Sequence, residues 1–584
     1  MYSKSIIRCS QAYKRWTYTK LVMDESKVDY SLRLQEAAPG SIDHDSPTEP
    51  TNNINGQESI EVAKPTYDAS PVLLSFIWFG MFLLAIAVSL AGQTIVSYQP
   101  YALSEFNAHS MLSVIGTIQY ILYAIVKPAL ARAANIWGLL EAFSLSIAAI
   151  LIGFAINAAS QNLGGLAAGQ IFYTIGQVGI QFLQQILVAE ITTLENRSIL
   201  GSLILSPTIF TSWIGAPIVS AMVPAKWRWA IIFPTISLPL LFSLWRQKKR
   251  AHKMESTATH GKLENVFALW SQFDIVGLIL LTASLTLILL PMTLSTTIFH
   301  SWSSPGKISM ITIGGCCFIA FLVYEVYVPK HPIILLKLTK NRTVVAGCIL
   351  QFVLYLSFYI WAPYFFSFLI IVNNESSKAA TNITAAQTVA IAVIGLLAAF
   401  LVRLTTTYKW VIMLGMTSKL VGAGLMLRYS NAGASTVQIL FGQLVSGAGT
   451  GMISIIAQTA VQAVTPRQDV ASVTTLYEVA GAIGGAVGNA ISGIVWTALL
   501  LSRLRANLPA TAQSAAVEIQ NSFLVASSYL PGSPERIAID KSYTEVMHVL
   551  LIVALAVLSV PFIAMFAMEN IRLKEETPEQ EEQK

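Results

Sequence analysis

The sequence predicts an all-α membrane protein with fourteen transmembrane helices, and three observations lead to this fold class. Hydrophobic residues make up 54% of the 584-residue chain and charged residues only 12%, which is too apolar for a soluble protein of this length. Stretches of about 20 residues with almost no charge recur along the chain, and a helix of that length crosses about 30 Å of hydrocarbon. A basic segment divides these stretches into six and eight, as in transporters built from two helical bundles.

The predicted spans are apolar runs that end at charged or turn-forming residues. The first bundle is predicted to contain 72–92, 111–131, 138–157, 163–188, 199–223 and 229–245. Two linker helices, 273–291 and 308–328, precede six spans of the second bundle, at 343–371, 382–402, 409–428, 437–459, 471–500 and 545–567. The arrangement is therefore two six-helix bundles plus two extra helices.

The segments between and beyond the spans are polar. Residues 1–70 carry Pro and Asn clusters such as "SPTEPTNNING" and are expected to form a disordered tail. The remaining segments are a basic loop at 246–272, a large loop at 501–544 and a second tail at 568–584. The main part of the second bundle lies at 329–500 and the last span at 545–567.

The distribution of positive charge predicts the orientation. An even number of spans places both tails on one side, and Lys and Arg are more frequent in the loops after even-numbered spans. The strongest contribution is "RQKKRAHK" at 246–253. Both tails are therefore expected in the cytosol, and 501–544 outside it. The net charge of +6 follows from this topology and gives no reason to expect a nucleic-acid partner.

Cysteines and nucleotide motifs give no sign of a resident cofactor or of an enzyme. Cys9 lies in the tail, and Cys316, Cys317 and Cys348 lie within spans, so neither a disulfide framework nor metal-ligand spacing can be read. No GxxxxGK[ST] loop occurs, so ATP is not expected to power this protein. An ion gradient is the expected source of energy. Nothing in the sequence predicts the oligomeric state.

Several segments resemble the fungal siderophore–iron transporter family, a fourteen-span branch of the major facilitator superfamily. They are "KPALARAANIWGLLEAF" (127–143), "FDIVGLILL" (273–281), "LLKLTKNRTV" (335–344), "GGAVGNAISGIVWTALL" (484–500) and "GSPERIAIDKSY" (532–543). The resemblance covers roughly residues 70–570. It implies the major facilitator fold and transport of a ferric chelate, although related proteins carry haem or exchange glutathione for protons. Iron is then expected only within the substrate.

Three positions depart from the family pattern, and each loses a charge. After span 2 the family usually has Asp where this chain has Asn135, and Arg where it has Leu139. In span 9, "WAPYFFSFL" resembles a Trp-Asp-x-Tyr-Phe pattern in which Ala362 replaces the acid. The first pair resembles a charge latch that helps to hold the cytosolic side closed.

Gating is therefore expected to depend on other residues. The resemblance implies that Lys127, Arg132 and Glu141 take over the latch. In span 5, Pro207 and Pro217 each remove a backbone donor and would bend or loosen the helix, which a rocking bundle could use. A static kink filled by packing is the competing interpretation.

Ionisable residues within spans are candidates for proton coupling, because burying them is costly. Glu478, in span 13, could load and release a proton, or it could form an inert ion pair with Lys419 of span 11. Glu190, Asp274 and Glu325 lie near cytosolic helix ends. For these three residues, hydration or a loop salt bridge is favoured over proton transfer.

Aromatic residues and one buried cation are candidates for substrate binding. Trp361, Tyr364 and Phe365 belong to the densest aromatic run, and rings with polar tips suit a large, partly apolar chelate. Lys419 would suit an anion such as glutathione or a haem propionate better than a neutral trihydroxamate complex. Packing or contact with lipid is the alternative for the rings.

The predicted external side offers further aromatic residues. Tyr98, Tyr101, Tyr529 and Tyr543 are candidate entrance contacts, with the aromatic belt of membrane proteins as the alternative. Residues 532–543 combine a "PGSP" turn with a short helix and are predicted to form a lid over the mouth. Anchoring of the last span is the alternative role.

The leading functional hypothesis is import of a ferric siderophore, of hydroxamate type, coupled to inward protons and bound between the bundles near the bilayer midplane. The partners are then the chelate, protons and the lipid bilayer. The alternatives are a proton-coupled glutathione exchanger or drug exporter, a haem importer, and a non-transporting chelate sensor. A plasma or endosomal membrane is expected, and a vacuolar membrane also fits.

Overall fold

Helices account for nearly all of the structure, a computed structural model that describes residues 71–192, 194–222, 274–294, 304–328, 338–466 and 469–570. The long helices before residue 330 are α2 (Pro71–Glu105), α3 (Leu112–Trp137), α4 (Leu139–Ala159), α5 (Leu163–Ile191), α6 (Leu194–Leu205), α7 (Pro207–Met222), α10 (Ile275–Thr293) and α11 (Pro305–Tyr327). The later ones are α12 (Arg342–Val372), α13 (Ser377–Thr405), α14 (Lys409–Tyr429), α15 (Thr436–Ala463), α16 (Val470–Asn507), α19 (Pro534–Val557) and α20 (Ser559–Ala567). Short elements are η1 (His109–Met111), η3 (Leu338–Lys340), η5 (Gln513–Ala515), α17 (Ala516–Asn521) and α18 (Phe523–Ser528).

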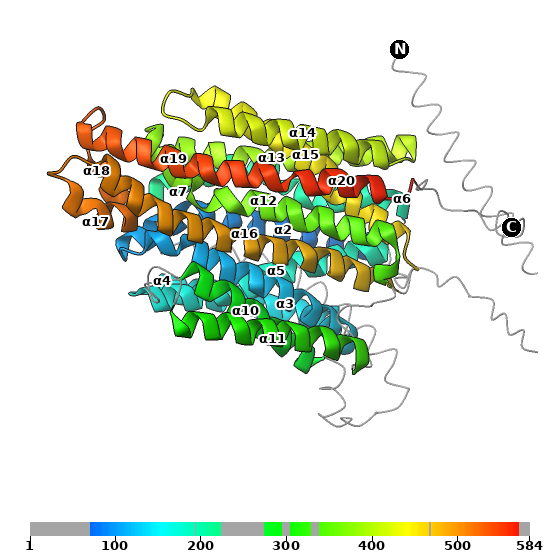
Figure 1. Cartoon of the computed structure of the whole chain (residues 1–584). Helices are drawn as coiled ribbons and strands as arrows, with labels where there is room; N and C mark the ends of the chain where they lie inside the picture. The colour runs from blue at the N-terminus through cyan, green and yellow to red at the C-terminus, as the bar shows by residue number, and fades with distance from the viewer. Residues whose placement is uncertain are drawn as a thin grey trace, which may run out of the picture. The chain divides into compact units, whose positions relative to one another are not determined.

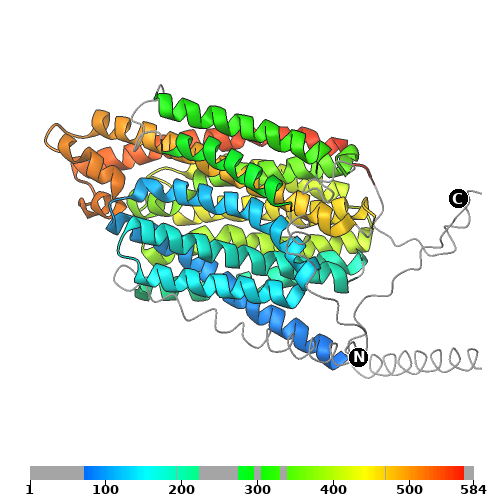
Figure 2. The ribbon, with the colours of Figure 1, turned by 90° about the horizontal axis from the view of Figure 1, so that it is seen from below.

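The long helices run side by side (Figures 1 and 2), and their contacts divide them into two groups. In the first group α2 packs against α7, and α5 packs against α3 and α4. In the second, α12 packs against α16 and α19, while α15 packs against α13 and α14. The groups meet where α3 contacts α16 and where α6 and α7 contact α13. We call this contact the seam.

The two helices between the groups cover one edge of the seam. α10 packs against both α3 and α16, and α11 packs against α10 at the margin of the protein (Figure 1). Leu281, Leu285 and Leu289 of α10 are buried in this contact. On α11, Ile319 and Val323 are more than half exposed, which suits contact with lipid.

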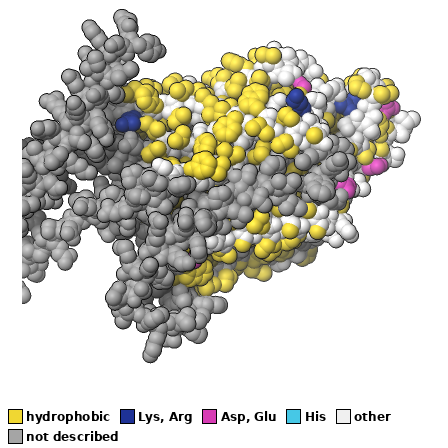
Figure 3. All heavy atoms as spheres, turned by 180° about the vertical axis from the view of Figure 1, so that it is seen from behind, with side chains coloured by type: hydrophobic (Ala, Val, Ile, Leu, Met, Phe, Trp, Pro, Cys, Tyr) yellow, Lys and Arg dark blue, Asp and Glu magenta, His cyan; other side chains and the backbone are white. Residues whose placement is uncertain are grey.

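The two ends of the described helices differ. The cap end carries α17 and α18, and the terminal end carries the start of α2 and the end of α20 (Figure 1). On the uncovered part of the face in Figure 3, apolar side chains dominate between the ends, whereas most charged ones lie toward the ends. Thirteen helical segments among the described residues are long and apolar enough to cross a bilayer. The protein is therefore a multi-pass membrane protein of all-α fold.

These thirteen segments coincide with thirteen of the fourteen predicted spans. The predicted span at 229–245, like the predicted tail at 1–70 and loop at 246–272, falls outside the described residues. Predicted span 5 is divided, because α6 ends at Leu205 and α7 begins at Pro207. Pro217 lies inside α7. The bend or loosening expected in span 5 thus takes the form of a one-residue interruption before Pro207, where the ring removes a backbone donor.

The last span begins earlier than predicted, and this corrects the expected shape of the 532–543 segment. Gly532 adopts a φ of 86°, and Ser533 caps α19 by accepting a hydrogen bond from Arg536 N. Pro534 occupies the first turn, where its missing N–H costs nothing. The polar residues therefore form the first turns of one continuous helix, not a separate lid with its own short helix.

Candidate functional site

A buried ion pair crosses the seam. Lys127 Nζ of α3 lies 2.5 Å from Glu478 Oε2 of α16, and only 11% and 9% of the two side chains are exposed. Glu478 is thus ion-paired, as the alternative interpretation expected, but Lys419, the partner suggested there, is wrong. Lys419 lies on α14 and donates to Ser446 Oγ of α15 at 3.0 Å, inside the second bundle. α14 packs on α15 and on the last span, away from the seam.

Four tyrosines lie beside the ion pair, on its cap-end side, and we call them the tyrosine cluster. Tyr120 and Tyr123 are on α3, and Tyr355 and Tyr359 are on α12. The ring centroids are 4.3 Å apart for Tyr120 and Tyr359, 4.7 Å for Tyr120 and Tyr123, and 6.2 Å for Tyr355 and Tyr359. Lys127 Nζ lies 5.7 Å from the centroid of Tyr123, within cation–π range.

Glutamines of the first bundle extend this polar region. Gln119 Nε2 donates to Gln170 Oε1 at 3.1 Å, and Tyr123 OH donates to Gln177 Oε1 at 3.3 Å. Tyr98 also hydrogen-bonds the Gln170 side chain, so it lies within the first bundle and not at an entrance. Together with the tyrosine cluster, the three glutamines form what we call the polar layer. Such a layer offers hydroxyl and amide groups in an otherwise apolar protein.

The seam is also closed toward the cap end. Tyr364 of α12 donates to Ser110 O at 3.0 Å and to Ser113 Oγ at 3.2 Å, both in the first bundle. Its ring lies parallel to Trp496 of α16, with centroids 3.8 Å apart. The other two aromatic residues predicted to bind substrate, Trp361 and Phe365, are buried, and their ring centroids lie 4.9 Å apart.

The other predicted entrance tyrosines lie near this closure. Tyr101 OH is 2.5 Å from Ser377 Oγ of α13, and its ring lies 4.9 Å from Phe523 of α18. The Tyr543 ring is 5.3 Å from Trp496. The structure therefore brings Tyr101, Tyr364 and Tyr543 together at the cap end. Tyr529 is half-buried in the segment after α18.

Arg536 holds the cap end together. Its guanidinium is buried at 2% exposure, and a buried guanidinium must satisfy several N–H donors. It donates to Ile371 O (2.5 Å), Asn374 Oδ1 (2.9 Å), Ala526 O (3.1 Å), Asp540 Oδ1 (3.1 Å) and Tyr529 O (3.3 Å). One side chain of α19 thus binds the end of α12 and the segment containing α18. Anchoring, the alternative role of the 532–543 segment, matches this geometry.

Asp274, the second predicted proton-coupling residue, is not brought to the contact between α3 and α16. Asp274 caps α10, where its Oδ1 accepts from Gly277 N at 3.2 Å, and it lies beside Tyr324 of α11. The favoured helix-end role thus matches the geometry of Asp274. The Glu190 side chain lies outside the described residues.

The predicted gating residues are spread over the first bundle. Lys127 faces the seam, while Arg132 is half-buried further along α3. Glu141 lies in the first turn of α4, beside Gly138. Of the positions that depart from the family pattern, Leu139 begins α4 and Ala362 is half-buried on α12. The Asn135 side chain lies outside the described residues.

The sequence-based search missed the tyrosine cluster. The signal was present as spacing, because residues three apart on α3 and four apart on α12 lie on one face of a helix. Tyr359 belongs to the aromatic run from which Trp361, Tyr364 and Phe365 were chosen, whereas Tyr355 lies just before that run, so composition did not mark the two residues as a pair. Only the contact between α3 and α12 unites the two pairs.

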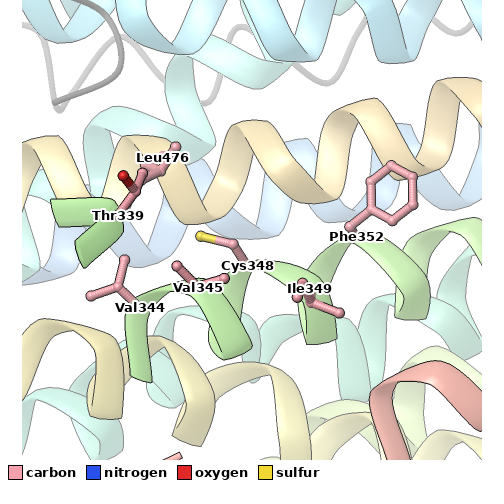
Figure 4. A pocket seen from close by; sticks show the side chains of 7 residues that line it. All are labelled: Thr339, Val344, Val345, Cys348, Ile349, Phe352 and Leu476. Carbon is pink, nitrogen blue, oxygen red and sulfur yellow. The ribbon is translucent and has the colours of Figure 1, made fainter. Parts of the chain in front are cut away.

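Hollows open at the surface of the described residues, and two of them lie beside helices of the second bundle. One, of about 260 Å³, lies along α12 and is lined mainly by apolar side chains, which suits contact with hydrocarbon (Figure 4). The other, of about 480 Å³, lies at the cap end between α16 and α17, and Ser110, Arg505 and Gln520 help to line it. Its mixed lining and its volume fall in the range of small-molecule sites.

Known proteins resemble this chain in sequence and in fold. Residues 77–376 match the Major Facilitator Superfamily model. Siderophore iron transporter mirC of Emericella nidulans is 36% identical over 536 residues, covering 89% of this chain and 87% of that protein. MFS siderochrome iron transporter C of Aspergillus fumigatus is 35% identical, with the same two coverages of 89% and 87%. Siderophore iron transporter 1 of Schizosaccharomyces pombe is 33% identical and covers 87% of this chain and 84% of its own length.

Solved structures share the fold alone. A bacterial homologue of the human lysosomal transporter Spinster, in an inward-facing and unoccupied conformation, has a TM-score of 0.54 at 12% identity. It covers 86% of this chain and 98% of its own length.

Proposed function

Because the chain belongs to the siderophore iron transporter family of the major facilitator superfamily, we propose that it imports a ferric siderophore and that inward protons drive the import. The observation that carries this proposal is the polar layer at the seam, with the Lys127–Glu478 ion pair beside it. In transporters of two bundles, substrate and coupling ion bind where the bundles face each other. The cap end is then external and the terminal end cytosolic.

The polar layer suits a hydroxamate chelate. Such a chelate presents carbonyl and hydroxamate oxygens on a large and partly apolar body. Tyrosine hydroxyls and glutamine amides supply donors for those oxygens, while the faces of Tyr120 and Tyr359 supply apolar contact. A site of this kind binds by many weak contacts and releases its ligand when the bundles move apart.

Alternating access requires the seam to open at one end at a time. Toward the outside, the chelate enters when Tyr364 leaves Ser110 and Ser113. Toward the cytosol, the Lys127–Glu478 pair must separate before α3 and α16 can move apart. The break between α6 and α7 lies where the first bundle contacts α13, so it can absorb part of this motion.

Glu478 is the proposed proton site. Its carboxylate is buried in the seam, and protonation removes the charge that attracts Lys127. An ion pair that holds two bundles together then weakens when the proton arrives. The membrane potential and the proton gradient would both favour this step from the external side.

Uptake of radio-iron supplied as a ferric hydroxamate tests the proposal. Iron-starved fungal cells that lack their own siderophore transporters should gain uptake with this protein and lose it with a protonophore. Glu478→Gln should abolish the protonophore-sensitive part. The matched control is Glu569→Gln, which removes an ion pair to Arg342 outside the seam (2.9 Å) and should leave uptake intact. No uptake by a protein that reaches the membrane would contradict the proposal.

A further inference from the structure

The charges around Lys127 indicate a role for this residue in substrate binding, which rests on the proposed function. The pair of Lys127 and Glu478 is neutral as a unit and is buried. Tyr123 on α3 lies beside Lys127 Nζ, and Tyr355 on α12 and Tyr477 on α16 itself lie beside the carboxylate. The acids of α10 and α11, Asp274 and Glu325, are grouped with Tyr324 instead. Among the described residues, Glu478 is the acid that forms an ion pair with Lys127, and no second one does.

A proton on Glu478 upsets this balance. The carboxyl group becomes neutral, and the ammonium of Lys127 is left as a buried charge without a counter-ion. Such a charge is strongly unfavourable unless another acceptor replaces the lost one. The Tyr123 ring, 5.7 Å from Nζ, can offset part of the cost, but a cation–π contact is weaker than a buried ion pair.

We infer that Lys127 is a substrate-binding residue. When Glu478 is protonated, the Lys127 ammonium leaves the Glu478 carboxyl group and binds the chelate. The proton comes from the external solvent and binds to the Glu478 carboxylate. The N–H···O contact with Oε2 breaks, and a new one forms from Nζ to an oxygen of the chelate. In the cytosol the steps reverse, because loss of the proton restores the carboxylate that recaptures Lys127.

Two properties follow from this exchange. The chelate and the proton bind cooperatively, and the coupling is reciprocal by linkage. The site also selects by charge, because an oxygen that carries negative charge compensates the ammonium better than a neutral carbonyl does. The preferred substrate class is therefore a ferric chelate that carries a free carboxylate or another anionic group, in preference to a neutral trihydroxamate of the same size.

The chain provides its own matched control. Lys419 is also a buried lysine within a span, with 3% exposure, but its Nζ donates to Ser446 inside the second bundle. Lys419→Gln removes the same charge as Lys127→Gln at a place away from the seam. A general effect of losing a buried lysine should appear in both variants. A substrate contact should be lost in Lys127→Gln alone.

Equilibrium binding to the purified full-length protein tests the inference without relying on transport. The probes are a neutral ferric trihydroxamate and an analogue of the same size with one free carboxylate, both loaded with radio-iron. Binding is measured between about pH 5 and about pH 8. The wild-type protein should prefer the carboxylate analogue by about tenfold at the acidic end, and the preference should shrink as pH rises.

The variants separate the roles of the two residues. In Glu478→Gln the analogue should bind tightly at every pH, because Lys127 has no competing carboxylate. Lys127→Gln and Lys419→Gln should differ, with only the former losing the preference for the analogue. Because Lys127→Gln leaves a buried carboxylate unpaired, the double variant Lys127→Gln/Glu478→Gln is included. It keeps the seam neutral and should bind both chelates equally at every pH.

The outcomes distinguish this inference from the proposed function. If both chelates bind but the double variant keeps the preference, or Glu478→Gln keeps the pH dependence, Lys127 is not the exchange residue and the inference fails alone. If neither chelate binds to monodisperse wild-type protein at any pH, the proposed function fails as well. Equal loss of the preference in Lys127→Gln and Lys419→Gln would also overturn the assignment.

Discussion

Tyr364 lies parallel to Trp496 at 3.8 Å, and its hydroxyl reaches across the seam to Ser113. The stack joins two helices of the second bundle, and the hydrogen bond joins them to the first. At this level the seam is held by aromatic and neutral polar contacts. Further toward the terminal end it is held by the Lys127–Glu478 charge pair. The two levels of the seam are therefore held by different kinds of interaction.

Loss of the Tyr364 hydroxyl should make the cap end open more often. Tyr364→Phe keeps the stack on Trp496 but removes both hydrogen bonds, each worth about 1 kcal/mol. With Ser110→Cys in a background without native cysteines, a membrane-impermeant thiol reagent should label the protein about five times faster or more in Tyr364→Phe. Ser110→Cys alone is the control. Equal labelling rates would mean that the hydroxyl does not hold the cap end closed.

Loss of the Arg536 guanidinium should destabilise the protein. Arg536→Gln removes a buried cation that satisfies three backbone carbonyls, at a cost of about 3 kcal/mol or more. The thermal midpoint of the detergent-purified protein should fall by several degrees. Lys541→Gln, five residues along the same helix and exposed, should leave the midpoint unchanged. Similar midpoints for both variants would show that Arg536 does not anchor the cap end.

A methyl group at Gly484 should separate α12 from α16. A Cβ there would overlap the Phe352 carbonyl oxygen, and a backbone atom cannot move aside cheaply. Gly484→Ala should therefore lower the yield of folded protein and its thermal midpoint. Gly424 has nothing within 4 Å of its added Cβ, so Gly424→Ala should be neutral or slightly stabilising. A tolerated Gly484→Ala would contradict the packing of these two helices.

The sequence predicted the membrane helices well because span length and apolar composition follow directly from bilayer thickness. It was less accurate where local capping decides a boundary. Ser533 and Pro534 start the last helix about three turns before the apolar run begins, so the polar residues 534–544 are helical. Hydropathy identifies segments that are apolar enough to lie in lipid, so it does not detect a polar extension of the same helix.

The candidate site was predicted only in part, and pairing explains the difference. Glu478 and Lys127 were each singled out, one for proton coupling and one for gating, but their contact joins helices 351 residues apart in the chain. Periodicity describes the face of one helix and not its partner. For the same reason Lys419 was predicted to bind the substrate, although α14 packs away from the seam.

The tyrosine cluster provides the last prediction, which concerns the strength of substrate binding. Tyr359 hydrogen-bonds Tyr120 across the seam, and their rings lie 4.3 Å apart. Tyr359→Phe keeps the ring and removes a hydroxyl that we expect to face the chelate. One lost hydrogen bond should raise the KM for ferric hydroxamate uptake about five- to tenfold, with little change in the maximal rate.

The control for this prediction is another buried tyrosine of the second bundle. Tyr408 OH donates to Glu569 O, so Tyr408→Phe loses a structural hydrogen bond of the same kind inside one bundle, away from the seam. It should lower the thermal midpoint and leave the KM unchanged, whereas Tyr359→Phe should change the KM. If both variants change only stability, the tyrosine cluster is a packing surface and the chelate binds elsewhere on the seam. A KM that rises only in Tyr359→Phe would place the chelate between α3 and α12.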